Sequence, residues 1–187
     1  IISDYNKIIE ISSLHAGFFE IELFSAMRSV LDNTTHSAMI IDMGAASTKL
    51  YIVERGVLRS SHIINRGSQD ITANIARINN ITFEEAEVIK RNIGTASGSE
   101  VNTADAVSSA SEYIFSEANR VLFSYQTATK INIEKVILIG GGASLKGIKE
   151  LASASLKTEV ISGDPFGKTE TPAFLEEVLR ETGPTFA

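Results

Sequence analysis

The stretch AMIIDMGAAST at residues 38–48 decides the fold, because it joins a buried strand to a tight polar turn. Asp42 ends the apolar run, and Gly44 follows almost at once. Ser47 and Thr48 then add two hydroxyl groups. A carboxylate, free backbone N–H groups and hydroxyl donors at the end of a strand suit the binding of phosphate together with a hard metal ion. The stretch therefore predicts phosphate and metal chemistry at one edge of a sheet.

A second strand followed by a tight turn, VILIGGGASL, occupies residues 136–145. The run Gly140, Gly141, Gly142 and Ala143 removes almost all side-chain bulk just before the next helical pattern begins. Backbone without side chains allows a flat ligand to approach closely. We expect this turn to face the base and sugar of a nucleotide.

The composition indicates one substantial core. The chain has 187 residues, of which 43% are hydrophobic, and it contains no cysteine. Disulfides and thiolate metal sites are thereby excluded, which is compatible with a reducing cytoplasm. The net charge of −6 and the scattered basic residues argue against a nucleic-acid partner. No apolar run reaches the roughly 18–20 residues that a membrane-spanning helix needs.

Hydrophobic periodicity places a boundary near residues 33–37, where the polar composition predicts a linker. Before this boundary, helical spacing predicts a helix within residues 1–17. Residues 18–23, FFEIEL, alternate like a short strand, and residues 22–31 return to a helical period. The N-terminal part is therefore expected to be separate from the main sheet.

After the boundary, three strand-like runs occupy residues 38–43, 49–55 and 57–64, and their short connections require antiparallel pairing. A helical insertion at about 68–98 and one long helix over 101–129 follow. The last expected elements are a strand at 134–140, a helix at 144–156, a strand at 158–162 and a helix at 172–181. This order predicts an α/β fold with a mixed five-stranded sheet, three antiparallel strands followed by two parallel ones, flanked by helices.

Taken together, these motifs resemble those of the actin-like ATPases, which include actin, sugar kinases and DnaK-type chaperones. Residues 42–48 resemble their second phosphate motif, and residues 140–147 resemble their adenosine motif. Within this superfamily the chain resembles the PilM family, the FtsA-like proteins of type IV pilus assembly. That resemblance is carried by HAGFFEIELFSAMRSV, IIDMGAASTKLYIVERG, INRGSQDITANIAR, TFEEAEVIKR and the turn GDPF at 163–166.

The resemblance implies an RNase H-like lobe of the actin fold. Residues 36–187 would form the second lobe, with its helical insertion at about 68–98. Residues 1–35 would be the tail of a small inserted subdomain and the end of the first lobe. Because nothing before Ser37 resembles the first phosphate loop of this fold, we expect the chain to be part of a longer protein. The full protein would be at most a weak ATPase, and these residues alone would be inactive.

The resemblance also implies ATP and Mg²⁺ as ligands. Asp42 would hold Mg²⁺ through water, because this ion keeps several waters beside a triphosphate. Gly44 would allow the turn. Ala45, Ser47 and Thr48 would offer N–H or hydroxyl donors to the phosphates.

The adenosine side of the implied site comes from two further segments. Glu87 and Lys90, one helical turn apart, match the segment that contacts the ribose and the edge of the base. Facing the adenosine would be Gly140, Gly141, Gly142 and Ala143. Outside this context, Glu87 and Lys90 would be an ordinary exposed helix pair, Asp42 a strand-end cap and the glycines only a tight turn.

Two other features of the sequence suggest a P-loop and a histidine metal site, but the spacing of the residues supports neither. Residues 163–169, GDPFGKT, superficially match a P-loop, but they have three residues between the glycines instead of four, and Pro165 lacks an N–H group. His15, His36 and His62 are isolated and have no partner at metal-ligand spacing. We therefore predict neither a P-loop nor a histidine metal site.

Three functions remain open from the sequence. The first is an ATP-dependent scaffold of pilus assembly in the cytoplasm. It would lie at the inner membrane through platform proteins and a PilN-like cytoplasmic peptide, with self-association left open. The second is a small-molecule kinase of the same fold, but residues 49–75 lack an Asp-rich or Arg-rich substrate clamp. The third is an FtsA-like division filament, which would be expected to carry a basic amphipathic tail, whereas residues 172–181 are acidic.

Overall fold

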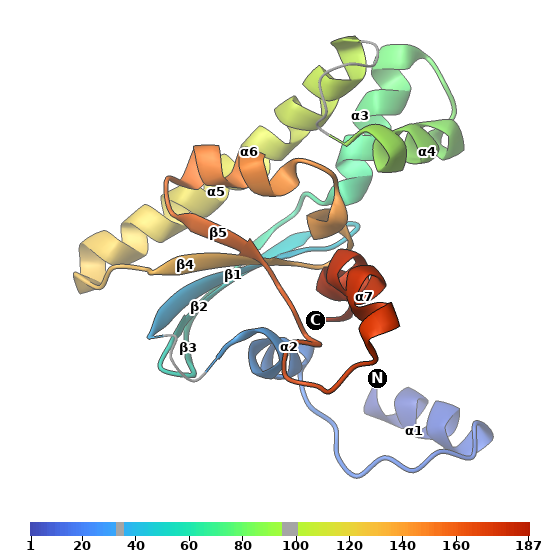
Figure 1. Ribbon diagram of the computed structural model, residues 1–187, viewed down its shortest axis with the longest axis vertical. Coiled ribbons are helices and arrows are strands. Elements are labelled where there is room, and N and C mark those ends of the chain that lie inside the picture. The colour runs from blue at the N-terminus through green and yellow to red at the C-terminus, as the bar shows by residue number, and fades with distance from the viewer. Residues whose placement is uncertain (33–35, 95–100) are drawn as a thin grey trace.

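The computed structural model describes residues 1–32, 36–94 and 101–187, and its centre is a five-stranded sheet with the order β3-β2-β1-β4-β5 (Figure 1). The strands are β1 (Ser37–Met43), β2 (Thr48–Glu54), β3 (Val57–Ile64), β4 (Lys135–Ile139) and β5 (Glu159–Ser162). The pairs β1–β2 and β2–β3 are antiparallel, whereas β1–β4 and β4–β5 are parallel. The predicted mixed sheet is confirmed.

Helices cover both faces of the sheet. The α-helices are α1 (Ile2–Ile11), α2 (Glu22–Val30), α3 (Ser68–Asn79), α4 (Phe83–Ile93), α5 (Val101–Thr129), α6 (Ile148–Leu156) and α7 (Glu176–Thr182). In Figure 1, α5 and α6 lie over one face, α3 and α4 extend from the same side, and α2 lies against the opposite face. The sheet is thus the middle layer of three.

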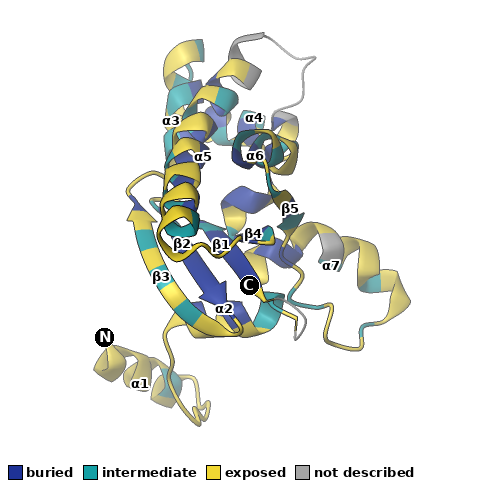
Figure 2. Ribbon diagram, turned by 90° about the vertical axis from the view of Figure 1, so that its left-hand side faces the viewer, coloured by how far each residue is buried: buried dark blue, intermediate teal, exposed yellow. Residues whose placement is uncertain are grey.

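The central strand β1 is buried on both sides, which explains its almost continuous apolar sequence (Figure 2). Met39, Ile41 and Met43 point into the larger core, beneath α3, α5 and α6. Ala38 and Ile40 point into a smaller core, which α2 closes. The buried side chains that α2 contributes to it are Leu23, Ala26 and Met27, and the partly buried Val30 packs against them.

Local hydrogen bonds fix the start of the two helices in the insertion. At α4, the Glu85 N–H donates to Thr82 Oγ1 over 3.2 Å, and the Thr82 N–H donates to Glu85 Oε2 over 2.9 Å. This reciprocal pair satisfies two N–H groups that the helix itself leaves unpaired. At α3, the Gly67 N–H donates to Asp70 Oδ2 over 2.8 Å. Capping hydrogen bonds therefore hold the first turns of both helices.

The structure corrects three boundaries that the sequence pattern suggested. Residues 18–21 form no strand, and α2 begins at Glu22. The helix expected over 144–156 is interrupted at Gly147, whose left-handed backbone (φ 78°) separates a short 3₁₀ turn from α6. The helix expected over 172–181 opens with a 3₁₀ turn and becomes α-helical at Glu176. The linker at 33–35 and the end of the insertion at 95–98 lie outside the described residues.

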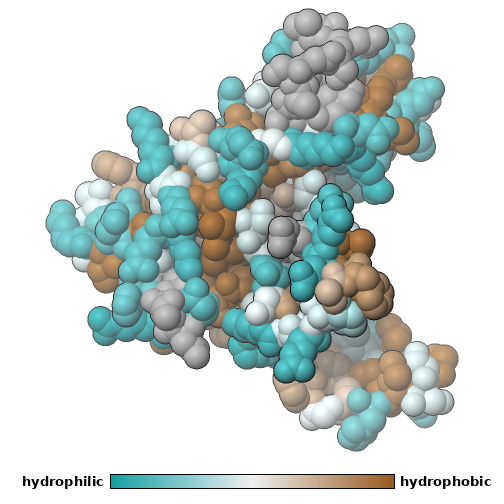
Figure 3. All heavy atoms as spheres, viewed as in Figure 1, coloured by the Kyte–Doolittle hydropathy of each residue, from teal (hydrophilic) through white to brown (hydrophobic). Residues whose placement is uncertain are grey.

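The N-terminal helix α1 buries none of its side chains. Together with the segment after it, α1 presents apolar groups on the surface (Figure 3). The exposed apolar residues of this region are Ile1, Ile2, Tyr5, Ile8, Ile11, Leu14, Phe18, Phe19 and Ile21. Among the helices described, none has both the length and the apolar character needed to cross a membrane.

Truncating the core residue Ile41 to Ala is expected to destabilise the fold by about 2–5 kcal/mol, because the fully buried side chain leaves a cavity under α5. Urea unfolding followed by circular dichroism measures this loss. Ile63→Ala is the matched control, since Ile63 is 60% exposed on the edge strand β3 and should change stability by less than about 0.5 kcal/mol. Equal losses for the two variants would contradict this account of the core.

Candidate functional site

Parallel pairing of β1 with β4 brings the two predicted turns together. Asp42 lies opposite Ile139 in this register, so each turn leaves the sheet at the same edge. A Cβ atom added to Gly140 would lie 2.6 Å from Asp42 Oδ1, and one added to Gly142 would lie 2.8 Å from Met43 Cβ. The turn after β4 therefore packs directly on the end of β1, and only glycine permits this approach.

The turn after β1 is held in shape by the start of α3. Its Gly44 N–H donates to the Ser47 carbonyl over 3.1 Å, which closes the turn. The N–H groups of Ser68 and Gln69 donate to the carbonyls of Gly44 and Ala45, both over 2.9 Å. In the described structure, none of the hydrogen bonds of this turn uses the N–H of Ala45 or Ser47. Donors suited to an anion thus remain available in a turn that is already rigid.

The hydroxyl of Thr48, one of the donors predicted for a phosphate, is engaged within the protein. Its side chain is fully buried, and its hydroxyl donates to the Arg66 carbonyl over 2.9 Å. A hydroxyl has a single proton to donate. Thr48 therefore fastens the connection between β3 and α3, and its hydroxyl is not available to a phosphate in this arrangement.

The turn after β4 contains four predicted site residues. Three of them pack within the protein, and the fourth, Gly141, faces a cavity. Gly140 needs its left-handed φ of 84°, and its N–H donates to the Pro184 carbonyl over 2.7 Å. Gly142 and Ala143 are buried. Gly141 differs, because a Cβ added there would meet no atom within 4 Å. Its small size is therefore not required by the packing of the protein itself.

Gly141 borders a cavity of about 610 Å³ between the two turns, α4 and the C-terminal segment. The volume lies within the usual range for small-molecule sites. Four of the predicted residues line it, namely Ala45, Glu87, Lys90 and Gly141. The other lining residues are Ser68, Gln69, Phe83, Arg91, Ser144, Leu145 and Thr185. Asp42, Gly44, Ser47, Thr48, Gly140, Gly142 and Ala143 do not line it.

The sequence contains a signal for some of the cavity residues that were not predicted and none for others. Arg91 follows Glu87 by four residues, a spacing that places both on one helical face. Ser68 and Gln69 reach the cavity because α3 docks on the turn after β1, and the sequence gives no local signal for this docking.

A polar network on α3 and α4 holds Glu87 at the wall of the cavity. Lys90 is 4% exposed, and its ammonium donates to Glu87 Oε2 (2.7 Å), Thr72 Oγ1 (2.8 Å) and the Ser68 carbonyl (3.2 Å). These three bonds use all three donors of the ammonium. Lys90 therefore orients Glu87 in this structure, and its direct contact with a ligand stays a prediction.

The carboxylate of Glu87 is kept ionised by its neighbours. Burial raises its pKa, but hydrogen bonds from Lys90, Thr72 and Arg91 outweigh burial and lower the pKa to about 2. The Arg91 Nε donates to Oε1 over 3.0 Å, and the Thr72 hydroxyl donates to Oε2 over 2.7 Å. Glu87 is therefore a fixed negative charge that can accept hydrogen bonds from ligand hydroxyl groups.

Asp42 has the opposite environment. It is half-buried, burial raises its pKa, and no cationic side chain of the described residues forms an ion pair with it. A carboxylate in this position gains from a bound cation that replaces the missing counter-charge. The described residues contain no cluster of three or more metal-ligating side chains. A single carboxylate fits Mg²⁺, which takes few protein ligands and completes its shell with water and phosphate oxygens.

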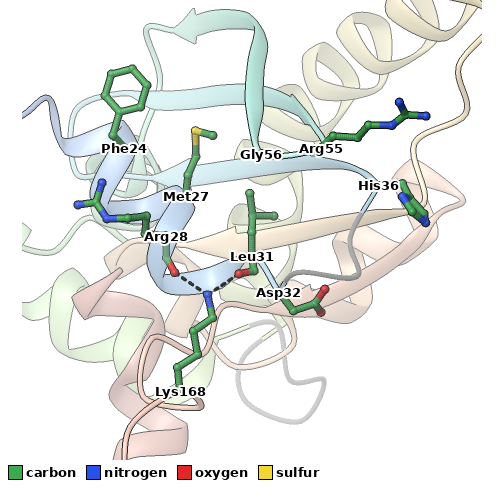
Figure 4. A pocket seen from close by; sticks show the side chains of 9 residues that line it. All are labelled: Phe24, Met27, Arg28, Leu31, Asp32, His36, Arg55, Gly56 and Lys168. Atoms are coloured by element: carbon green, nitrogen blue, oxygen red, sulfur yellow. Dashed lines mark hydrogen bonds between the residues drawn. The ribbon is translucent and has the colours of Figure 1, made fainter.

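A second cavity, of about 630 Å³, lies beside α2 and contains none of the predicted site residues (Figure 4). Apolar side chains of α2 and several cationic residues line it. Lys168 enters it from the segment after β5, and its ammonium donates to the carbonyls of Arg28, over 2.6 Å, and Leu31. These bonds complete the C-terminal end of α2.

Comparison with known proteins identifies the family. The sequence profile of the family described as Cell division protein FtsA matches residues 39–179. The chain belongs to the FtsA family. The cell division protein FtsA of Staphylococcus epidermidis (strain RP62A) is 29% identical over 143 residues, which cover 66% of this chain and 31% of that protein. The chain thus spans about a third of the length of this curated FtsA relative.

Solved structures show the fold of this FtsA-family chain. A PilM–PilN type IV pilus biogenesis complex matches with a TM-score of 0.82 and 21% identity, covering 99% of this chain and 54% of that one. MreB5 of Spiroplasma citri bound to ADP matches with a TM-score of 0.64 and 15% identity, covering 96% of this chain and 66% of that one. The predicted actin-like lobe is thereby confirmed as the fold, and an actin-like neighbour is seen with a bound nucleotide.

The network around Glu87 predicts a pH dependence of stability. Because the folded-state pKa is lowered to about 2, the stabilisation is complete above the unfolded pKa of 4.5 and is lost as the pH falls toward 2. At 1.36 kcal/mol per pKa unit, with a reduction for partial exposure, the contribution is about 1–2 kcal/mol. Urea unfolding at pH 6 and pH 3 should show that Glu87→Gln removes this part of the acid sensitivity. Glu84→Gln, an exposed change on the same helix, is the control, and an equal effect of both variants would refute the prediction.

Proposed function

We propose that the chain is the ATP-binding second lobe of an actin-like scaffold that acts in type IV pilus assembly. The observation that supports this most directly is the meeting of two turns at one sheet edge. One turn offers free N–H groups beside the Asp42 carboxylate, and the other presents the bare backbone of Gly141 to a cavity that also contains Glu87. The MreB5 neighbour, which shares the fold, was solved with ADP bound, and this supports a nucleotide as the ligand.

In the proposed site, each group has a separate task. The N–H groups of Ala45 and Ser47 bind phosphate oxygens, and Asp42 holds Mg²⁺ through its water ligands. The adenosine lies against Gly141, where no side chain obstructs it, and Glu87 accepts hydrogen bonds from the ribose. Gly44, Gly140, Gly142 and Ala143 keep the two turns close together. When bound, Mg²⁺ would offset the negative charge of the phosphates.

The scaffold role depends on a larger protein. The chain covers 54% of the PilM chain that it resembles and 31% of the FtsA relative. We propose that residues 36–187 form the second lobe and that residues 1–35 belong to the part that joins it to a first lobe. The exposed apolar face of α1 would be covered there. ATP would then favour closure of the two lobes, with hydrolysis weak at most.

The proposed partners come from the PilM–PilN complex. By analogy, the closed protein would bind a PilN-like cytoplasmic peptide and lie at the inner membrane through platform proteins. The second candidate is a role in cell division, which the family profile and the Staphylococcus epidermidis relative favour. The two candidates share the nucleotide site and differ in their partner.

Isothermal titration of the full-length protein with ATP tests the site. With Mg²⁺ present, Asp42→Asn should weaken binding by about 10- to 100-fold, as expected for loss of a group that holds the ion, while binding of ADP without Mg²⁺ stays unchanged. Gly141→Leu should abolish binding in both conditions without lowering the melting temperature, because a Cβ atom at this position meets no atom of the protein, while the side chain would enter the space assigned to the adenosine. Gly17→Leu is the control, since it also meets open space but lies far from the cavity along the chain. Unchanged ATP binding by Gly141→Leu would refute the assignment.

A binding assay with a PilN-type cytoplasmic peptide separates the two candidate roles. For a pilus scaffold, we expect fluorescence anisotropy to show saturable binding of the labelled peptide, strengthened by Mg²⁺ and ATP. A peptide of the same composition in scrambled order is the control. Absence of binding, together with location of the fluorescently tagged protein at the division site in cells, would instead support the role in cell division.

A further inference from the structure

Helix α2 is attached to the sheet by lysines that come from other elements. At its C-terminal end, Lys168 bonds two carbonyls of the last turn, as Figure 4 shows, and Lys135 pairs with Asp32 over 3.1 Å. At its N-terminal end, Lys49 of β2 forms an ion pair with Glu22. Among the described residues, Lys168 and Lys135 attach the C-terminal end of α2, and Lys49 attaches its first turn.

Lys49 is also the direct neighbour of the proposed metal ligand. It lies opposite Asp42 in the antiparallel pair of β1 and β2, so both side chains project from the same face of the sheet. Such partners have Cβ atoms only about 4.5–5.5 Å apart. The flexible four-carbon stem of lysine can span this distance. Two carboxylates, Glu22 on α2 and Asp42 on β1, are therefore within reach of the Lys49 side chain, and the structure shows it paired with Glu22.

We propose that Lys49 couples the metal site to α2 by exchanging between these two carboxylates. A cation at Asp42 repels the Lys49 ammonium and strengthens its pair with Glu22. Without a cation, Lys49 spends part of its time at Asp42, and the first turn of α2 loosens. The proposal rests on the proposed function, because it requires Mg²⁺ at Asp42.

The exposure of the three groups determines how strong this coupling can be. Lys49 and Glu22 have side chains that are 30% and 65% exposed, so water screens their pair and its energy is small. Asp42 is half-buried, so an ammonium beside it competes effectively with the metal ion. Because the Lys49–Glu22 pair is weak and the Asp42 carboxylate is partly desolvated, the Lys49 ammonium can exchange between them. A stronger Glu22 pair would hold Lys49 permanently.

Through this coupling, the presence or absence of a cation at Asp42 would affect the N-terminal part of the chain. Residues 1–21 lead directly into α2, and most of their large apolar side chains are exposed. A more tightly held first turn of α2 would restrict the orientations that residues 1–21 can adopt. Metal binding at Asp42 would thus affect the N-terminal segment through the Lys49 side chain and the first turn of α2.

Two single substitutions should change the Mg²⁺ affinity in opposite directions. Glu22→Gln releases Lys49 toward Asp42 and should weaken Mg²⁺ binding about two- to fivefold. Lys49→Met removes the competing cation and should strengthen binding by a similar factor. The double variant should behave like Lys49→Met, because Glu22 acts only through Lys49. A lysine that merely anchors α2 would leave the Mg²⁺ affinity unchanged in all three.

The measurement is a Mg²⁺ titration of the full-length protein at saturating ADP, with hydrogen exchange of residues 22–31 as a second readout. In the wild type, Mg²⁺ with ADP should slow exchange in the first turn of α2, and Lys49→Met should abolish this change. Glu20→Gln is the matched control, because Glu20 pairs with Arg28 of the same helix and not with Lys49. If the wild type binds ADP and Mg²⁺ but the two single variants shift together or not at all, the coupling is wrong and the site stands. If the wild type binds neither, both proposals fail.

Discussion

The parallel register of β1 and β4 is the constraint on which the rest of the structure depends. It sets Asp42 opposite Ile139, so that a polar turn and a glycine turn from distant parts of the chain leave the sheet at the same edge. Ligand sites of α/β proteins form where strands end in this way. The hydrogen bonds from Ser68 and Gln69 then fix the polar turn on α3, and the left-handed backbone of Gly140 fits the second turn against the first. A shift of one residue in this register would turn the Asp42 side chain to the other face of the sheet.

The site combines a satisfied charge with an unsatisfied one. Lys90 and Glu87 neutralise each other within a complete set of hydrogen bonds, and their geometry is therefore fixed in advance. Asp42 has no such partner in the described part of the chain and carries a raised pKa caused by burial. The first arrangement shapes one wall of the cavity. The second leaves a half-buried carboxylate without an ion-pair partner among the described residues, and the proposed site uses it to hold a cation.

The sheet and its two turns could be predicted from the sequence, because the residues that indicate them are close together along the chain. The apolar runs and the short connections predicted the sheet, and the polar and glycine residues predicted the two turns at its edge. Glu87 was assigned to the same site only through the resemblance to actin-like ATPases, and it lines one cavity together with Ala45 and Gly141. The errors arose where tertiary contacts override local pattern. The strand-like alternation at 18–23 has no neighbouring strand to pair with, and the Thr48 hydroxyl is taken by a carbonyl brought close by folding. The attachment of α2 by Lys49 and Lys168 likewise joins distant residues, and nothing in their spacing indicates it.

A crystal structure of the full-length protein with Mg²⁺ and a non-hydrolysable ATP analogue tests the central claim most directly. The account predicts electron density for the metal ion at the Asp42 carboxylate, linked through water, with the phosphates on the N–H groups of Ala45 and Ser47. It also predicts the adenosine against Gly141 in the cavity walled by Glu87. A nucleotide bound elsewhere, such as in the cavity beside α2, or a metal ion held without Asp42, would contradict it.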